Sequence, residues 1–519
     1  MRFETLLALT PVAMVIAFLI AALASARTTP RRAGALSANA GVLGVVGAVL
    51  MLSLYVVAGA QSFAILPKGW FAFGTRIDAL SVIALSVVVG IGLVVIRFSR
   101  AYLDGNPRQH LFFAWLNATL AAVVLLVTAG TLLQLTVGWI LTSLALHQLL
   151  VFFPERRRAV SAARKKFVFA RFSDVALVGA AVLLWQHYGT ADLGELAAAI
   201  RATGPSASVV AAAVFLSVAA MLKCAQFPTH GWLTEVMDTP TPVSALLHAG
   251  IVNGGGFLLI RFADVIVTSP AAMATLIIVG AMSASLASLS MLTQTNVKAS
   301  LSYSTVSQMG FMLMQCGLGA FSTAAVHLVA HSLYKGHSFL ASGNAVDNVQ
   351  AWRLAGLSTR PIPGWVIAGA LVTAAVIYVG MAYAAHTFIG LPFAVLALGF
   401  VYVFGLCVFL VHGATNQAVF MRVLPAALGA TIAYLGLQWT ALQFFAGTIP
   451  PAPAMTPTML TLTIAIVVLF ASVAWLQLVV PKSQRAWATS LYLAARNGFY
   501  INHYLSRMTG VFKRVTPSA

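Results

Sequence analysis

Continuous apolar runs recur along the whole chain, and about 20 apolar residues are enough to cross the hydrocarbon core of a bilayer as a helix. Of the 519 residues, 60% are hydrophobic and only 8% are charged, whereas about 25% are charged in a soluble domain. This composition excludes a soluble enzyme. The runs are too long and too continuous for a transmembrane barrel, whose strands alternate apolar and polar residues. The chain is therefore predicted to be an all-α polytopic membrane protein.

We expect about fifteen transmembrane helices, because about that many runs reach the length of a span. The first run ends in a sequence similar to a signal-peptide cleavage site. It is longer than a typical signal segment and basic residues follow it, so we interpret it as a retained span. The spans are predicted near residues 5–24, 38–58, 77–96, 111–128, 131–153, 168–187, 207–227, 242–261, 271–292, 299–319, 321–342, 364–385, 390–412, 424–445 and 458–480.

The basic residues indicate how these spans are oriented. The chain has 30 Lys and Arg against 11 Asp and Glu, a net charge of +19. In a soluble protein this excess would suggest nucleic acid, but in a polytopic protein it is typical of cytoplasmic loops. We therefore expect a bacterial inner membrane protein with its N-terminus outside, its C-terminus in the cytoplasm, lipid around it and no nucleic-acid partner. The basic clusters fall in alternate connections: Arg27, Arg31, Arg32; Arg97, Arg100, Arg108; Arg156, Arg157, Arg158, Arg164, Lys165, Lys166; Lys298; Arg353, Arg360; and Arg422.

The segment Ala220–Pro228 places a lysine late in an apolar span. A charge at this depth costs about 2.5–3.5 kcal/mol on insertion scales, so Lys223 is a candidate functional residue. Pro228 removes a backbone donor and predicts a break in the helix between these two residues. A broken helix inside the membrane must face protein or water, which suits a buried ammonium group. The alternative is that the Lys223 side chain extends to the membrane surface.

A second group of titratable residues lies in the predicted span 321–342. His327, His331 and Lys335 recur every four residues and so share one helical face, with His337 close by. Histidine titrates near neutral pH, so this stripe favours a proton relay. Plain packing and a metal site are the alternatives. No carboxylate or cysteine shares the face, which weighs against a metal.

Two further charged segments flank these spans. Arg171 and Asp174 form an i, i+3 pair that could neutralise itself. Glu235 and Asp238 follow the predicted break and are expected at the membrane interface. His248 lies about two turns into the next span. After residue 480, aromatic and basic residues alternate, which predicts an interfacial amphipathic tail or, alternatively, a solvated terminus.

Together these segments resemble the antiporter-like, proton-translocating family that includes the large membrane-arm subunits of respiratory complex I and the Mrp sodium/proton antiporters. The similarity rests on residues 171–174, 223–248 and 293–343 and covers roughly residues 75–345. It implies two inverted five-helix repeats, each with a broken helix and a half-channel. The implied organisation is N-terminal helices over 1–110, repeats over 111–262 and 271–412, and C-terminal helices with the tail over 413–519.

The resemblance also implies roles for individual residues. It implies a central lysine with a neighbouring acid and a channel histidine in the first half-channel, followed by a polar axis to the second. No catalytic residue and no metal ligand is implied. The implied ion-translocating residues are Lys223, Asp174 and His248, then Lys298, His327, His331 and Lys335, with Glu235, Asp238 and His337 as secondary candidates.

Two positions depart from the family pattern. Where the family has Gly-Trp-Glu, whose carboxylate pairs with the central lysine, this chain has Gly138-Trp139-Ile140. The twelfth span carries no charge at residues 377–380, where the family has a buried lysine with adjacent acids. The family relay therefore cannot operate unchanged. The chain also ends within about forty residues of its last predicted span, without the long lateral helix of the largest complex I subunit.

In these departures the chain resembles the membrane subunits of the Dab inorganic-carbon accumulation complexes. That resemblance implies a soluble zinc-binding DabA-like partner, related to β-carbonic anhydrases, in a hetero-oligomer. It implies that the zinc belongs to the partner, that this chain has no cofactor, and that proton or sodium flow energises bicarbonate or CO₂ uptake. Two other interpretations stay open. The chain could serve a complex I or Mrp-type antiporter complex, or it could be a non-conducting membrane anchor.

Overall fold

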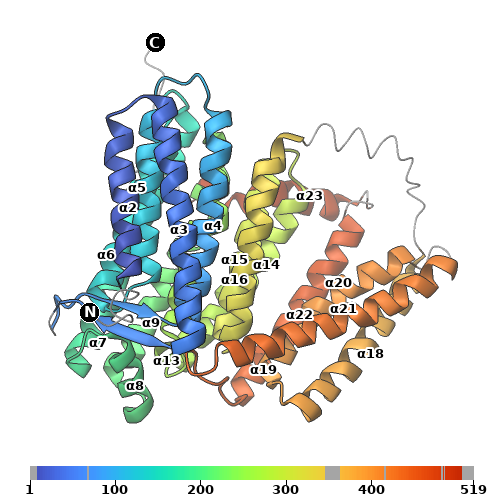
Figure 1. Ribbon diagram of the computed structural model, residues 1–519. Helices are drawn as coiled ribbons and strands as arrows, with labels where there is room; N and C mark the ends of the chain where they lie inside the picture. Colours follow the sequence, from blue (N-terminus) through green and yellow to red (C-terminus); the bar gives the residue numbers. More distant parts are fainter. Residues whose placement is uncertain are drawn as a thin grey trace.

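The computed structural model describes residues 9–66, 69–344, 363–413, 417–480, 483 and 485–504. Long helices dominate it, and α2–α7 run side by side from one end of the molecule to the other (Figure 1). The long helices are α2 (Thr10–Ala26), α3 (Pro30–Ala58), α4 (Ala79–Tyr102), α5 (Gln109–Val127), α6 (Leu132–Leu150), α7 (Arg157–Tyr188), α9 (Ala207–Lys223), α14 (Pro270–Leu292), α15 (Val297–Gly317), α16 (Phe321–Leu340), α18 (Gly364–Ile389), α20 (Gly399–Gly413), α21 (Gln417–Phe444) and α22 (Pro457–Val479).

Shorter elements complete the chain. Three of them, α11, η2 and α12, join into one apolar segment from Thr241 to Arg261. The short elements are α8 (Leu193–Thr203), α10 (Gly231–Glu235), η1 (Val236–Asp238), α11 (Thr241–Leu246), η2 (Leu247–Ile251), α12 (Gly254–Arg261), α13 (Ala263–Ile266), η3 (Ala341–Asn344), α19 (Phe393–Ala397), α23 (Ala486–Arg496) and η5 (Gly498–Tyr500).

The prediction of an all-α polytopic membrane protein is confirmed in its main features. Every predicted span coincides with a described helix or with two or three joined helices. In the described part of the chain, 11 segments are long and apolar enough to cross a membrane. The helices α2 and α9 are apolar but shorter, and α15 and α16 are long but carry more polar residues. The polar residues of α16 include the predicted histidine and lysine stripe.

Short polar side chains set the start of several helices. Asp78 accepts a hydrogen bond from the Ser81 backbone N–H, and the Ser81 hydroxyl interacts in return with the Asp78 backbone, which makes a capping box. Such caps satisfy backbone donors that have no partner within the helix. The other side-chain caps of long helices are Thr131 before α6, Ser206 before α9, Ser269 before α14, Asn296 before α15 and Thr456 before α22.

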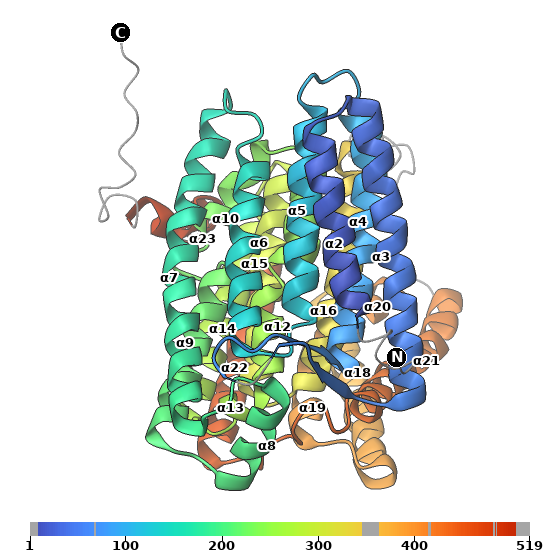
Figure 2. The same cartoon turned by 60° about the vertical axis from the view of Figure 1, so that its left-hand side comes forward.

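A small β-hairpin departs from the all-α prediction. Strands β1 (Gln61–Ala64) and β2 (Gly74–Ile77) pair antiparallel between α3 and α4. A Cβ at Gly74 would lie 2.6 Å from the Phe63 carbonyl oxygen, so this pairing requires glycine there. Figure 2 shows the hairpin and α8 at the same end of the helices. Each strand has only four residues and lies between long apolar runs, so its alternation of residues is too short to predict a strand from the sequence.

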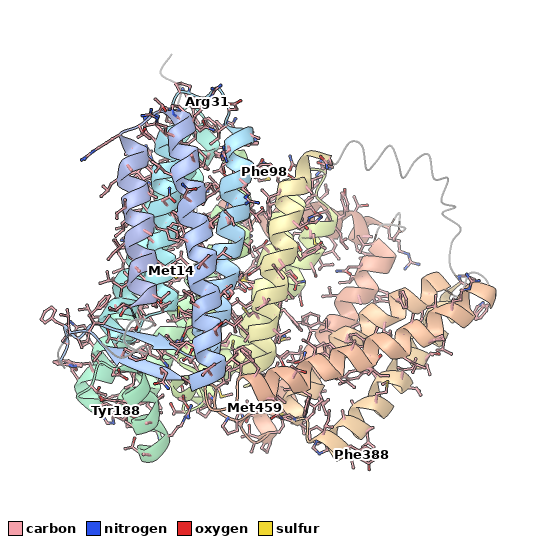
Figure 3. The ribbon with its side chains drawn as sticks, viewed as in Figure 1. Met14, Arg31, Phe98, Tyr188, Phe388 and Met459 are labelled. Atoms are coloured by element: carbon pink, nitrogen blue, oxygen red, sulfur yellow. The ribbon has the colours of Figure 1, made fainter. Side chains whose placement is uncertain are left out.

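One basic connection can be compared with the side predicted to carry few basic residues. Arg31, in the first turn of α3, lies at the opposite end of the molecule from Tyr188, the last residue of α7 (Figure 3). The mixed charges of α8 lie near the Tyr188 end, as expected for the side without basic clusters. Arg353 and Arg360 lie outside the described residues. Which side faces the cytoplasm stays a prediction.

The C-terminal helices form a second body of packing. One large core joins α2–α16, whereas α18, α20 and α21 share a separate, smaller core and lie obliquely beside it (Figure 1). A third cluster joins α14 and α15 to α19, α20 and α22. Helix α18 is continuous from Gly364 to Ile389. The repeat boundaries themselves stay a prediction.

The predicted amphipathic tail is a helix that contacts the body. In α23, Ala488 and Ala495 are buried, whereas Trp487 and Leu493 are exposed. The Gln294 side chain donates a hydrogen bond to the Arg496 carbonyl over 3.2 Å. The tail therefore packs one face on the helices near α14. The part of the predicted tail beyond residue 504 lies outside the described residues.

Candidate functional site

The predicted break after Lys223 is confirmed. Helix α9 ends at Lys223, the chain turns, and α10 starts only at Gly231. Within the turn, Ala225 has φ = 51°, in the left-handed region that residues other than glycine rarely adopt. Such backbone strain persists only where the surrounding structure enforces it, and it concentrates at functional sites. The Lys223 side chain is therefore fixed at a helix end inside the core.

Glycines on α12 let this helix approach the end of α9. A Cβ at Gly255 would lie 2.6 Å from the Ala220 carbonyl oxygen, and a Cβ at Gly256 would collide with the Met312 sulfur. A Cβ at Gly254 would meet Lys223 and Trp139 at 3.6 and 3.8 Å. Small residues allow such close helix contacts in membranes. The glycine run thus closes the space around the lysine.

Trp139 occupies the position next to the missing family carboxylate. The Lys223 Nζ lies 4.2 Å from the centroid of the Trp139 ring, which is fully buried. Among the described residues, this Nζ has no hydrogen-bond partner. A desolvated cation–π contact with tryptophan is worth about 2 kcal/mol. The ring face therefore holds the lysine where Ile140 offers no carboxylate.

Asp174 supplies a carboxylate in the neighbourhood of Lys223, where the family carboxylate is missing. It forms an ion pair with Arg171 over 2.7 Å, as the i, i+3 spacing predicts, and its side chain is buried. It also interacts electrostatically with Lys223. Because Arg171 offsets the charge of Asp174, the lysine does not gain a full counter-ion from it.

Two adjacent lysines on α7 point to different partners, and the sequence analysis did not select either as a site residue. Lys165 Nζ lies 2.8 Å from both carboxylate oxygens of Glu235. Lys166 Nζ donates to the carbonyl oxygen of Ser143 over 2.7 Å and to its hydroxyl over 2.8 Å. Glu235 is half-buried and also accepts a hydrogen bond from Asn502 in the C-terminal segment. The adjacent Lys166 lies deeper, among the helices.

Lys223 lines two small cavities. One, of about 40 Å³, is also lined by Thr142, Asn253 and Ser332. The other, of about 20 Å³, is also lined by Lys166. Each exceeds the roughly 10–15 Å³ that a water molecule needs. The lysine is therefore placed between two compartments that can each hold water.

The first cavity leads toward α16. The Asn253 side chain donates a hydrogen bond to the Ser332 hydroxyl over 2.7 Å. Ser332 adjoins His331, whose two ring nitrogens have no partner among the described residues although the side chain is buried. Lys335, three residues after Ser332 on α16, is fully buried, and its Nζ lies 3.4 Å from the Leu301 carbonyl oxygen.

The structure brings the predicted stripe together. The rings of His327 and His331 lie 6.1 Å apart. His327 Nδ1 lies 2.9 Å from Gln315 Oε1, and its Nε2 lies 2.9 Å from Gln308 Oε1. The two glutamines, seven residues apart on α15, thus hold the His327 ring between them. The two glutamines were not selected from the sequence, although their seven-residue spacing places them on one face of α15.

His248 joins this region from the other side. It lies in η2, a turn of π-helix inside the Thr241–Arg261 segment, and such turns are frequent at functional sites. Its Nδ1 lies 3.0 Å from the Thr305 hydroxyl, and its ring stacks on Phe339 at 4.2 Å. His248 also interacts electrostatically with Lys335.

The remaining candidates lie at the edge of this region. Lys298 is half-buried and donates to the Thr241 hydroxyl over 2.9 Å. The Asp238 carbonyl accepts a hydrogen bond from Arg156 over 2.6 Å, and its side chain is half-buried. His337 is exposed. Within the described part of the chain, no group of three His, Cys, Asp or Glu side chains could hold a metal ion.

At the position of the missing second lysine, the structure has tyrosines. The Tyr378 hydroxyl on α18 donates to the Leu396 carbonyl over 2.8 Å. The rings of Tyr402 and Tyr434 stack at 4.7 Å beside it, and the Tyr402 hydroxyl lies 3.1 Å from that of Thr431. This region is polar but uncharged.

A buried ion-pair network at the hairpin end was not predicted. Asp78 is bound by Arg261 over 2.5 and 3.2 Å and by Arg76 over 2.7 Å. Burial alone raises the pKa of the Asp78 carboxyl, but the two guanidinium groups and their hydrogen bonds outweigh it and hold this pKa well below its usual range. Nearby, Arg201 pairs with Asp264 over 2.6 Å. Asp78 and Arg261 are 183 residues apart, and Arg201 and Asp264 are 63 apart, so neither pair leaves a local signal in the sequence.

Comparisons with known proteins agree with this geometry. Residues 129–429 match the family described as NADH:quinone oxidoreductase/Mrp antiporter, TM, and residues 68–113 match the family described as complex I chain 5 N-terminus. Among solved structures, the chain is similar to one in the Mrp complex from Dietzia sp. DQ12-45-1b, with a TM-score of 0.62 and 22% identity. That similarity covers 98% of this chain and 61% of the other, and it concerns the fold alone.

Curated relatives are more specific. The chain is 45% identical over 303 residues to the "Probable inorganic carbon transporter subunit DabB" of Hydrogenovibrio crunogenus, an alignment that covers 58% of each protein. It is 34% identical over 453 residues to the "Probable inorganic carbon transporter subunit DabB2" of Halothiobacillus neapolitanus. The second alignment covers 85% of this chain and 80% of the relative. The first thus spans just over half of its relative's length.

Proposed function

The chain belongs to the antiporter-like family of complex I and Mrp membrane subunits, as a DabB-like inorganic carbon transporter subunit, and we propose that it conducts a cation, the proton in the first place. The flow of this cation energises the uptake of bicarbonate or CO₂. One elementary charge crossing 100 mV releases about 2.3 kcal/mol, which is sufficient to drive accumulation. A soluble DabA-like partner captures the inorganic carbon and holds the zinc.

The observation that supports conduction most is the environment of Lys223. It is a buried lysine at a broken helix, over a tryptophan ring, with two water-sized cavities beside it. One cavity is lined by Asn253 and by Ser332, which is the neighbour of His331 on α16. A titratable group between two hydrated compartments can take a proton from one and release it to the other.

A non-conducting anchor is the second candidate, because two observations favour it. Ile140 stands where the family has a carboxylate, and α18 carries no charge. The anchor shares the fold and the partner but needs no titratable Lys223. A complex I or Mrp-type role predicts instead that quinone-reducing or antiporter subunits accompany the chain.

Growth separates these candidates. The chain and its partner are expressed in cells that lack carbonic anhydrase and depend on inorganic-carbon uptake. Lys223→Ala should abolish growth in air, whereas Arg97→Ala, at an exposed position, should not. Both variants must co-purify with the zinc-containing partner to equal extent. Full growth of Lys223→Ala at normal expression would support the anchor.

A further inference from the structure

The smaller cavity beside Lys223 has a lining that the family relay does not account for. Its volume is about 20 Å³, and its polar lining residues are Lys166, Lys223 and Trp232; the other lining residues are apolar. The three side chains come from α7, α9 and α10. They are 5%, 8% and 4% exposed, so each is more than nine-tenths buried.

Two of these three polar groups have unused hydrogen-bonding capacity. Lys223 Nζ and Trp232 Nε1 have no hydrogen-bond partner among the described residues. Leaving a buried donor unsatisfied costs about 1–3 kcal/mol. Lys166 Nζ donates to the carbonyl oxygen and the hydroxyl of Ser143, which uses two of its hydrogens. A polar cavity of this size with several such partners fits a water molecule.

We propose that a water molecule in this cavity joins Lys166 to Lys223, and that the two amines share one proton through it. This inference rests on the proposed function, because it extends the path of the conducted proton to α7. Lys166 is the second proton-carrying group of this half-channel, in place of the carboxylate that Ile140 lacks.

Hydrogen-bond counting requires that only one of the two lysines is charged. A water oxygen accepts two hydrogen bonds and donates two. The Trp232 indole N–H and one ammonium fill its two acceptor positions, so the second lysine must accept from the water through the lone pair of a neutral amine. Two ammonium groups on one buried cavity would also repel each other strongly. The other ionisable groups that interact electrostatically with Lys166 are Asp174, Arg171 and His147.

The transfer moves one proton and needs no other reactant. An N–H bond of the Lys223 ammonium breaks as an O–H bond forms on the water, and another O–H bond of that water breaks as an N–H bond forms on Lys166. One positive charge passes from α9 to α7, and nothing is oxidised or reduced. As a neutral amine, Lys166 donates both hydrogens to Ser143 and keeps its lone pair for the water.

Substitutions of Lys166 test this proposal in the full chain, purified with its partner and reconstituted in vesicles that report proton uptake under an imposed potential. Lys166→Met and Lys166→Arg should each lower the proton flux on the order of a hundredfold, the usual contribution of a positioned proton carrier. Arginine keeps the positive charge but does not deprotonate in proteins. Recovery of flux in Lys166→Arg would show a merely structural role and overturn the proposal.

Two controls keep the test decisive. Lys165→Arg alters the adjacent lysine, which pairs with Glu235 outside the cavity, and should leave the flux within about twofold of the unmodified protein. Trp232→Phe keeps an aromatic ring but removes the indole N–H donor, and it should lower the flux measurably even if Lys166→Met fails to fold. Normal flux in both Lys166 variants, with loss in Lys223→Met, would contradict this inference alone. Normal flux in Lys223→Met would contradict the proposed function itself.

Discussion

The two parts of the molecule treat buried polarity differently. The ion pairs named above join described residues between positions 76 and 264, from the hairpin through the first predicted repeat to α13. The helices α18, α20 and α21 pack instead around tyrosine hydroxyl and threonine contacts. Helix α16 contacts both parts. Its histidines and lysine face α15 and η2, and its Thr323 hydroxyl donates a hydrogen bond to the Gln438 side chain on α21.

On the proposed function, this difference indicates which part of the molecule conducts the ion. Titratable side chains beside water-sized cavities lie around Lys223, whereas the tyrosine cluster offers only hydroxyl groups, which do not ionise near neutral pH. On the proposed function, we expect ion conduction in the first part and in α16, and a packing role for α18, α20 and α21. Substitutions in the two parts should have effects of very different size.

The largest effect is expected for Asp78→Asn, which should reduce the free energy of unfolding by about 3–5 kcal/mol, because it leaves Arg261 buried without its counter-ion. The folded-state pKa of Asp78 is lowered, so its contribution is present at neutral pH and is lost as the pH falls through that low value. Thermal unfolding in detergent at several pH values measures this. A matched change, Asp192→Asn, keeps a side-chain oxygen that can cap α8 and should cost less than about 1 kcal/mol. Equal losses in both variants would contradict the assignment.

A smaller effect, on the order of a hundredfold, is expected for the proton flux of Lys335→Met, because it removes a buried carrier from the α16 stripe. His337→Gln, on the exposed side of the same helix, should keep normal flux. Vesicle assays compare the two variants. Normal flux in Lys335→Met would restrict the path to the first part of the molecule.

Trp139→Leu should lower the flux by about tenfold, because a cation–π contact of about 2 kcal/mol no longer holds Lys223 in place. Trp139→Phe keeps a weaker aromatic face and should lie between Leu and the unmodified protein. An additional Ile140→Glu substitution in Trp139→Leu supplies the family carboxylate and should restore part of the flux. If Leu and Phe behave alike, the ring face is not what holds the lysine.

The smallest effect is expected for Tyr378→Phe, which should change the flux by less than about twofold and the stability by about 1 kcal/mol, the usual value of one hydrogen bond. Flux and thermal midpoint are measured on the same preparation. A loss of flux as large as that of Lys335→Met would show that the tyrosine cluster conducts, and the contrast between the two parts would fail.

Much of this architecture could be predicted from the sequence. Long apolar runs gave the spans because lipid leaves few alternatives to helices, and Pro228 gave the break after Lys223. The four-residue spacing gave the shared face of His327 and His331. Each of these features depends on residues that are close in the chain.

Features that depend on distant residues could not be predicted. Trp139 and Lys223 meet only after α6 and α9 pack, as do Asp78 and Arg261. Lys166 is a different case. The charge pattern places it among the basic loop residues, but α7 starts at Arg157, so Lys166 lies inside a helix on the same face as Asp174, eight residues later. The eight-residue spacing between Lys166 and Asp174 can be read from the sequence, and it identifies Lys166 as a candidate site residue.

Proton uptake by vesicles containing the chain with its partner, with and without Lys223→Met, tests the central claim most directly. Under an imposed potential, the unmodified protein should take up protons, and Lys223→Met should fall to the level of empty vesicles while still binding its partner. Replacing protons by sodium as the driving ion in the same assay identifies the conducted species. Undiminished, potential-driven uptake in Lys223→Met would contradict the account.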